Sequence, residues 1–166
     1  MKQFLRISRD KDKKYMLNQS KIKQIIKILK LLIMPKGLKA GQTLYECTTN
    51  YQWLFYIGVL AVVYRDNPEK RRYETGLLEI CRKNFKTFTI AVIFIILFLT
   101  EPDFSKFYSV APDGSLSKEI KEALKEIILS SPDLYRWHDH ERFKLLRDSI
   151  EFLPKASKYI PLSLNF

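Results

Sequence analysis

The sequence has few of the residues that usually carry chemistry in a small protein. Of its 166 residues, two are cysteines and two are histidines. Cys47 and Cys81 form neither a disulfide framework nor a CxxC pair, so we expect buried small hydrophobic residues in a reducing compartment. The sequence also lacks a GxxxxGK[ST] phosphate loop, a dinucleotide-binding glycine triplet and a GxSxG nucleophile motif. These absences predict a protein that is not an enzyme and binds no cofactor.

Long hydrophobic runs are also missing. The two most apolar stretches, Tyr51–Tyr64 and Phe88–Leu99, are shorter than the roughly 20 residues that a membrane-spanning helix needs. Met1 begins a mixed polar and basic run, which does not resemble a secretory signal. We therefore expect a cytoplasmic protein in which both runs are buried. The alternative is a peripheral or hairpin membrane protein with a basic cytoplasmic face.

Acidic residues are scarce at the start of the chain. Between Met1 and Ala40, twelve Lys or Arg residues are opposed by Asp10 and Asp12 alone, whereas the remaining residues include 17 basic and 16 acidic side chains. Nearly all of the formal net charge of +11 therefore lies in the first quarter of the chain. A basic block of this density indicates a polyanionic partner, either nucleic acid or an anionic membrane surface.

Hydrophobic periodicity predicts an all-α fold, a single-domain bundle of about five to six helices. We expect a basic N-terminal arm over residues 1–19 and a helical bundle over residues 20–166. The run Phe88–Leu99 is rich in β-branched residues, but we see no second strand-like segment to pair with it, which favours a buried helix. The tail is expected to pack on the body. The predicted helices cover residues 20–34, 41–65, 68–86, 88–99, 115–131 and 140–153.

The first predicted helix has a lysine on one side at every turn. Ser20 is the expected N-cap, and Lys23, Lys27 and Lys30 share a face opposite the apolar residues. Such a face can bind phosphate groups without reading sequence. Tyr15, Tyr45 and Tyr73 lie near the basic segments and could stack on unpaired bases. The candidate nucleic-acid-binding residues are Arg6, Arg9, Lys13, Lys14, Lys21, Lys23, Lys27, Lys30, Lys36, Lys39, Arg71, Arg72 and Lys83.

The stretch "RWHDHERFK" contains both histidines and resembles a metal site. His138 and His140 are two residues apart, which places them roughly 200° apart around a helix and prevents them from sharing one ion. Asp139 suits a helix N-cap, followed by Glu141 in the first turn. We therefore expect no metal site. A metal-dependent phosphohydrolase using His138, Asp139 and His140 remains the second alternative function.

The segments "SKIKQIIKILKLL" and "EKRRYETGLLEICRKNFK" suggest a family. Two basic helix faces in a bundle without catalytic motifs resemble the small subunit of CRISPR effector complexes of the Cascade type, the type I-D complex in particular. This resemblance implies a non-catalytic subunit of a ribonucleoprotein. Its expected partners are the guide–target duplex or the displaced single strand, and other protein subunits, including copies of itself.

Overall fold

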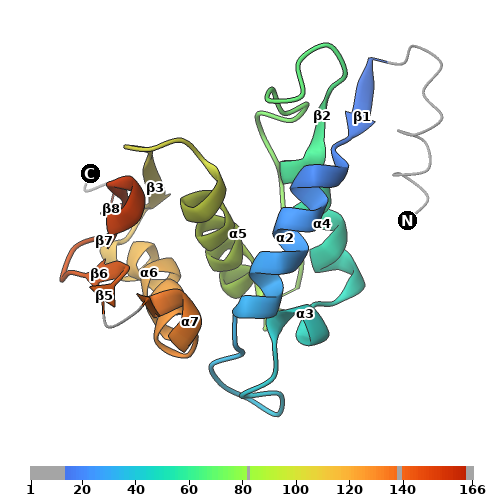
Figure 1. The fold of residues 1–166 in the computed structure, drawn as a ribbon. Helices are drawn as coiled ribbons and strands as arrows, with labels where there is room; N and C mark the ends of the chain where they lie inside the picture. The colour runs from blue at the N-terminus through green and yellow to red at the C-terminus, as the bar shows by residue number, and fades with distance from the viewer. Residues whose placement is uncertain (1–13, 82, 138–139, 164–166) are drawn as a thin grey trace. The chain divides into compact units, whose positions relative to one another are not determined.

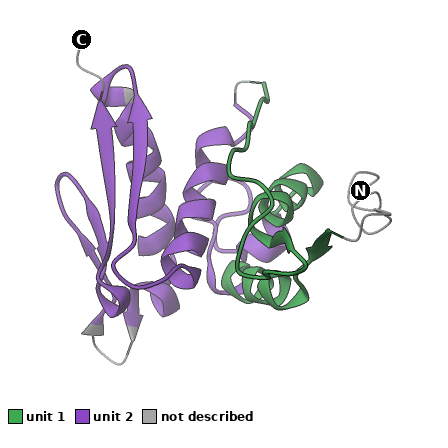
Figure 2. Ribbon diagram, turned by 90° about the horizontal axis from the view of Figure 1, so that it is seen from above, with its two compact units in different colours: residues 1–29, 48–81 green, residues 30–47, 82–166 purple. Residues whose placement is uncertain are grey.

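The structure, a computed structural model, describes residues 14–81, 83–137 and 140–163. Within these residues the chain forms six α-helices and eight short strands, so the fold is mixed α/β and the predicted all-α bundle is wrong. The chain divides into two compact units, residues 1–29 with 48–81 (unit 1) and residues 30–47 with 82–166 (unit 2; Figure 2). Most of the predicted basic arm lies outside the described residues, and the predicted boundary at Ser20 stays a prediction.

Unit 1 contains two main helices and a two-stranded ribbon (Figure 1). The strands pair antiparallel, with Tyr15 opposite Tyr64. The apolar side of the first helix is buried at Ile25, Ile28 and Leu29, as the periodicity predicts. The elements are β1 (Tyr15–Leu17), α2 (Gln19–Leu31), α4 (Asn50–Ala61) and β2 (Val62–Tyr64), and α2 ends two residues inside unit 2.

The starts of these two helices are fixed by side-chain hydrogen bonds. The backbone N–H of Lys21 donates to Asn18 Oδ1 at 3.1 Å, so Asn18 performs the capping role that we expected of Ser20. At α4, the N–H of Thr49 donates to Gln52 Oε1 at 2.9 Å, which forms a capping box. This second start divides the helix predicted over residues 41–65, because the chain re-enters a helix only at Asn50.

The helix predicted over residues 68–86 is also wrong. After β2 the chain turns and pairs back on the strand: Tyr64 N–H donates to the Lys70 carbonyl at 3.0 Å, and Arg72 N–H donates to the Val62 carbonyl at 2.9 Å. From there to Cys81 the chain forms neither helix nor hydrogen-bonded strand. Backbone pairing with a strand close in sequence therefore overrides the Pro68 helix-start signal.

Unit 2 combines a four-stranded sheet with two long helices (Figure 1). The strand order is β3-β8-β7-β6, with β3 and β8 parallel and the other pairs antiparallel. Helix α6 packs against α5 and against β3 and β8. The elements are α3 (Leu44–Cys47), α5 (Lys86–Thr100), β3 (Lys106–Ala111), α6 (Gly114–Leu129), α7 (Pro132–Tyr135), β4 (Arg136–Trp137), β5 (His140–Glu141), β6 (Phe143–Leu145), β7 (Ile150–Phe152) and β8 (Ser157–Ser163).

Helix α5 supplies the centre of the unit 2 core and confirms the helical interpretation of the Phe88–Leu99 run. Its Phe98 side chain is fully buried, with its ring centroid 5.1 Å from that of Phe107, 5.7 Å from Phe143 and 6.2 Å from Phe152. None of the helices in the described residues is both long and apolar enough to cross a membrane. A cytoplasmic location stays a prediction.

The last predicted helix, residues 140–153, is replaced by β-structure. Strands β6 and β7 pair as a hairpin in which Phe143 lies opposite Phe152, and Leu146 N–H donates to the Ser149 carbonyl across the turn at 3.0 Å. Phe143, Ile150 and Phe152 are buried. The tail then forms β8, which lies between β3 and β7 and so holds the sheet together.

Truncating the central ring tests this core. We expect Phe98→Ala to lower the free energy of unfolding by about 3–5 kcal/mol, because the change leaves a cavity among three aromatic neighbours. Denaturant unfolding followed by circular dichroism measures the loss. Leu129→Ala, at a half-exposed position, is the control and should change stability by less than about 1 kcal/mol. Equal losses for both variants would contradict this description of the core.

Candidate functional site

The turn before α5 has an unusual backbone. Lys83 and Phe85 both have positive φ, 67° and 56°, and Phe85 adopts the left-handed helical conformation at the N-cap of α5. For a residue with a Cβ this conformation costs about 1–2 kcal/mol. The Phe85 carbonyl accepts hydrogen bonds from the N–H and the hydroxyl of Thr89, each at 2.8 Å. These bonds to a buried part of α5 hold the turn in its strained conformation.

The amino-terminal end of α5 carries only positive charge. Its first turn has no acidic residue, and its N-cap residue, Phe85, has no side-chain oxygen that could accept a hydrogen bond from the helix. The first N–H groups of a helix have no partner within it, and the helix dipole makes this end positive. Lys83 and Lys86 add two ammonium groups here, where an anion rather than a cation stabilises a helix. The turn therefore has the electrostatic character of an anion-binding site.

The sequence of the turn matches the end of the phosphate-loop pattern. In GxxxxGK[ST] the last two positions are Lys and Ser or Thr at the start of a helix, and Lys86 and Thr87 occupy them here. The two glycine positions hold Ile80 and Phe85. Phe85 nevertheless has the positive φ that glycine adopts readily. A search for the full pattern misses this turn, whereas Lys-Thr directly before a long apolar run is the signal that would have found it.

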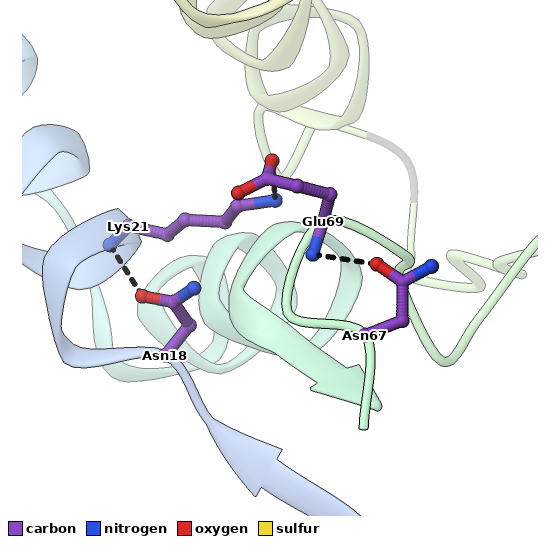
Figure 3. Close-up of polar contacts among 4 residues, drawn as sticks. All are labelled: Asn18, Lys21, Asn67 and Glu69. Carbon is purple, nitrogen blue, oxygen red and sulfur yellow. Dashed lines mark hydrogen bonds and ion pairs between the residues drawn. The ribbon is translucent and has the colours of Figure 1, made fainter. Parts of the chain in front are cut away.

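The lysines predicted to share one face of the first helix are exposed, with the neighbouring Lys21 as an exception. Lys23, Lys27 and Lys30 are exposed on α2, and the Lys30 ammonium lies 5.0 Å from the Tyr45 ring centroid. Lys21 differs, because its Nζ lies 3.6 Å from Glu69 Oε2, and Glu69 N–H in turn donates to Asn67 Oδ1 (Figure 3). Lys21 therefore fixes the turn after β2 to the start of α2.

The remaining predicted residues belong to different elements of the two units. Lys36 forms an ion pair with Glu126 at 2.8 Å, whereas Lys39 is exposed in the same loop. Lys83 belongs to the turn before α5. Lys14, Arg71 and Arg72 lie on or beside the β1–β2 ribbon. The described candidates thus belong to several elements of the two units, and Arg6, Arg9 and Lys13 lie outside the described residues.

The histidine stretch is not a helix start. Arg136–Trp137 pairs antiparallel with His140–Glu141, and Tyr135 Oη donates to Glu141 Oε1 at 2.9 Å. This hydrogen bond raises the pKa of Tyr135 above its ordinary value. The predicted cap Asp139 and its neighbour His138 lie outside the described residues. Among the residues that are described, no three His, Cys, Asp or Glu side chains group together as metal ligands do.

Comparison with known proteins identifies a shared fold. No protein-family model and no curated protein matches the chain. Among solved structures, the crystal structure of the HK97 bacteriophage large terminase is similar, with a TM-score of 0.66 at 21% sequence identity. The match covers 85% of this chain and 27% of the terminase chain, so the chain spans about a quarter of the length of the protein that it resembles.

The fold match corrects two expectations. The resemblance to a CRISPR small subunit is wrong, because the fold is a mixed α/β arrangement shared with part of a large terminase. The expectation that the chain is not an enzyme is corrected by the same finding, because the protein that shares its fold bears the name of an enzyme.

Proposed function

We propose that this chain is part of a terminase-like protein that acts on DNA, and that its unit 2 binds the phosphates of a nucleotide. The observation that carries the proposal is the turn Lys83–Thr87, with its left-handed Phe85 and its lysine-flanked helix end. The fold shared with a large terminase supports it. Assembly with other protein chains is part of the same proposal.

Each component of the turn has a role in phosphate binding. The N–H groups of the first turn of α5 donate hydrogen bonds to phosphate oxygens. Lys86 supplies an ammonium group that neutralises the outer phosphates, and the Thr87 hydroxyl adds a polar contact beside it. The Phe85 side chain keeps a phosphate ligand farther from the backbone of the turn than a glycine at this position would. We therefore expect weak binding in the natural sequence.

Replacing Lys86 tests the nucleotide site. We expect Lys86→Ala to weaken binding of a fluorescent nucleoside triphosphate about tenfold or more, because the variant cannot form a charge-assisted hydrogen bond to phosphate. Fluorescence titration at fixed salt measures the affinity. Lys125→Ala removes the same charge from an exposed position on α6 and should leave the affinity unchanged. Equal effects of the two variants would exclude this site.

Introducing a glycine at position 85 tests the same site through an expected gain in nucleotide affinity. We expect Phe85→Gly to strengthen nucleotide binding about tenfold, the equivalent of roughly one further hydrogen bond to a charged group. It should not lower the thermal midpoint, because glycine adopts φ near 56° without strain. Titration of both proteins in parallel, with melting curves as the check on folding, gives the comparison. An unchanged or weaker affinity in a folded variant would argue against a phosphate-binding turn.

We propose further that the exposed lysines of α2 bind the phosphate backbone of DNA. Lys23, Lys27 and Lys30 have no carboxylate partner among the described residues, whereas Lys21 pairs with Glu69. Contacts of this kind release counterions and give affinity without sequence preference. The prediction that a basic helix face of this chain contacts nucleic acid is therefore proposed for α2.

Charge reversal on α2 tests the DNA contact. We expect the triple variant Lys23→Glu, Lys27→Glu, Lys30→Glu to weaken binding to duplex DNA. The slope of log affinity against log salt should fall by about 0.9 for each phosphate that the variant no longer neutralises. Fluorescence anisotropy over a salt series measures both quantities. The control variant Lys118→Glu, Lys125→Glu, Lys144→Glu makes the same charge change at exposed positions elsewhere. If both variants change the slope equally, α2 is not the contact surface.

A further inference from the structure

Three tyrosines and three cations form a compact cluster on the β1–β2 ribbon of unit 1. The rings of Tyr15 and Tyr64 face each other across the two strands, with centroids 5.1 Å apart in an edge-to-face arrangement. Cation–π contacts occur about once per 70–80 residues in proteins, so the concentration here is a distinct feature of the surface. The members of this aromatic–cation cluster are Lys14, Tyr15, Tyr64, Lys70, Arg72 and Tyr73.

Arg72 is the central cation of the cluster. Its guanidinium carbon lies 4.1 Å from the ring centroid of Tyr15 and 4.9 Å from that of Tyr73. A guanidinium stacked on an aromatic face keeps its N–H donors at its edge, where they can reach a phosphate. The ammonium groups of Lys14 and Lys70 lie 5.7 Å and 5.2 Å from the ring of Tyr64. All three cations therefore lie against rings rather than against carboxylates.

The backbone holds these cations in place. Arg65 N–H donates to the carbonyl of Lys14 at 2.9 Å, Tyr64 N–H donates to that of Lys70 at 3.0 Å, and Arg72 N–H donates to Val62. Each basic residue is thus tied by a main-chain hydrogen bond to β2 or to the residue that follows it. Binding to a surface with an ordered backbone costs less loop-ordering entropy than binding to lysines on a flexible loop.

Within the described part of the chain, no carboxylate is paired with the cations of the cluster. Among the described residues, the acidic residues nearest in sequence are Asp66, Glu69 and Glu74, all exposed. Glu69 pairs with Lys21 on α2 (Figure 3). Among the described carboxylates, none forms an ion pair with Lys14, Lys70 or Arg72. A polyanion can therefore approach these cations without displacing any of the described carboxylates.

We propose that the aromatic–cation cluster binds single-stranded nucleic acid, with phosphates on the three cations and an unpaired base stacked on Tyr73. Tyr73 is 40% exposed, the largest exposure among the three tyrosines, whereas Tyr15 and Tyr64 are half-buried and support the cations. An aromatic ring stacks on any unpaired base, which gives affinity without sequence preference. Bases in a duplex are already stacked on each other, so a duplex gains from the cations alone.

Two single-stranded oligonucleotides, one with bases and one abasic, distinguish the contribution of stacking from that of charge. The full chain is titrated with a labelled oligothymidine strand and with an abasic strand of the same length and charge. We expect Tyr73→Ala to weaken oligothymidine binding about tenfold and to leave binding of the abasic strand unchanged. Tyr73→Phe, which keeps the ring, should bind both strands as the natural protein does. Equal loss for the two strands in Tyr73→Ala, or no loss for either, overturns the proposal.

Neutralising the cations completes the test. The double variant Lys14→Gln, Lys70→Gln should bind both strands more weakly, and its salt slope should fall by about 0.7 for each phosphate that it no longer neutralises. Both lysines are exposed, so the variant should fold, and an unchanged melting curve checks this. Lys118→Gln, Lys125→Gln on α6 is the control for charge. Equal effects of the two double variants, or binding to anionic phospholipid vesicles as tight as to oligothymidine, overturn the proposal.

The proposal for the aromatic–cation cluster and the proposal for the nucleotide site are tested independently. The Tyr73, Lys14 and Lys70 variants lie in unit 1, and they should leave nucleotide binding at the Lys83–Thr87 turn unchanged. The variants Lys86→Ala and Phe85→Gly should in turn leave oligothymidine binding unchanged. A chain that binds oligothymidine through Tyr73 but binds no nucleotide would remove the proposed function and keep this inference.

Discussion

Unit 2 depends on the burial of α5. Seven of its fifteen side chains are buried, and they lie around most of the helix circumference. A helix of this kind is stable only when other elements enclose it, and α6 with the aromatic residues of the sheet does so here. The backbone position of its first turn, which carries Lys86 and Thr87, is therefore determined by the core.

The same burial explains how a phenylalanine is kept in a left-handed conformation. Phe85 is 62% exposed, so its own side chain contributes little packing. What holds it is its carbonyl, which accepts two hydrogen bonds from Thr89, a buried residue one turn along α5. The strain of about 1–2 kcal/mol is thus opposed by two local hydrogen bonds from a residue that is anchored in the core.

The elements that the sequence predicted correctly are those set by local signals. Helices α2 and α6 have clear apolar periodicity, whereas α5 was predicted because its apolar run has no second strand-like segment to pair with. The hairpin β6–β7 was missed because Phe143, Leu146, Ile150 and Leu153 also fit a helical spacing. What decides between the two is pairing with β8, which is a later part of the chain. The candidate turn before α5 was missed for a different reason, since the Lys86-Thr87 pair is a weak sequence signal and the positive φ of Phe85 is visible only in the structure.

Counting charges located the basic part of the chain but did not reveal how each charge is used. Lys21, Lys36 and Lys158 are paired with carboxylates, so they contribute to the fold. Lys14, Lys70 and Arg72 lie against aromatic rings instead. A carboxylate cancels a cation's charge, whereas a ring attracts the cation through its quadrupole and leaves the net charge in place. Aromatic partners therefore order basic side chains while preserving the field that draws in a polyanion. This physical difference, which composition does not show, separates the basic residues that stabilise this protein from those suited to binding.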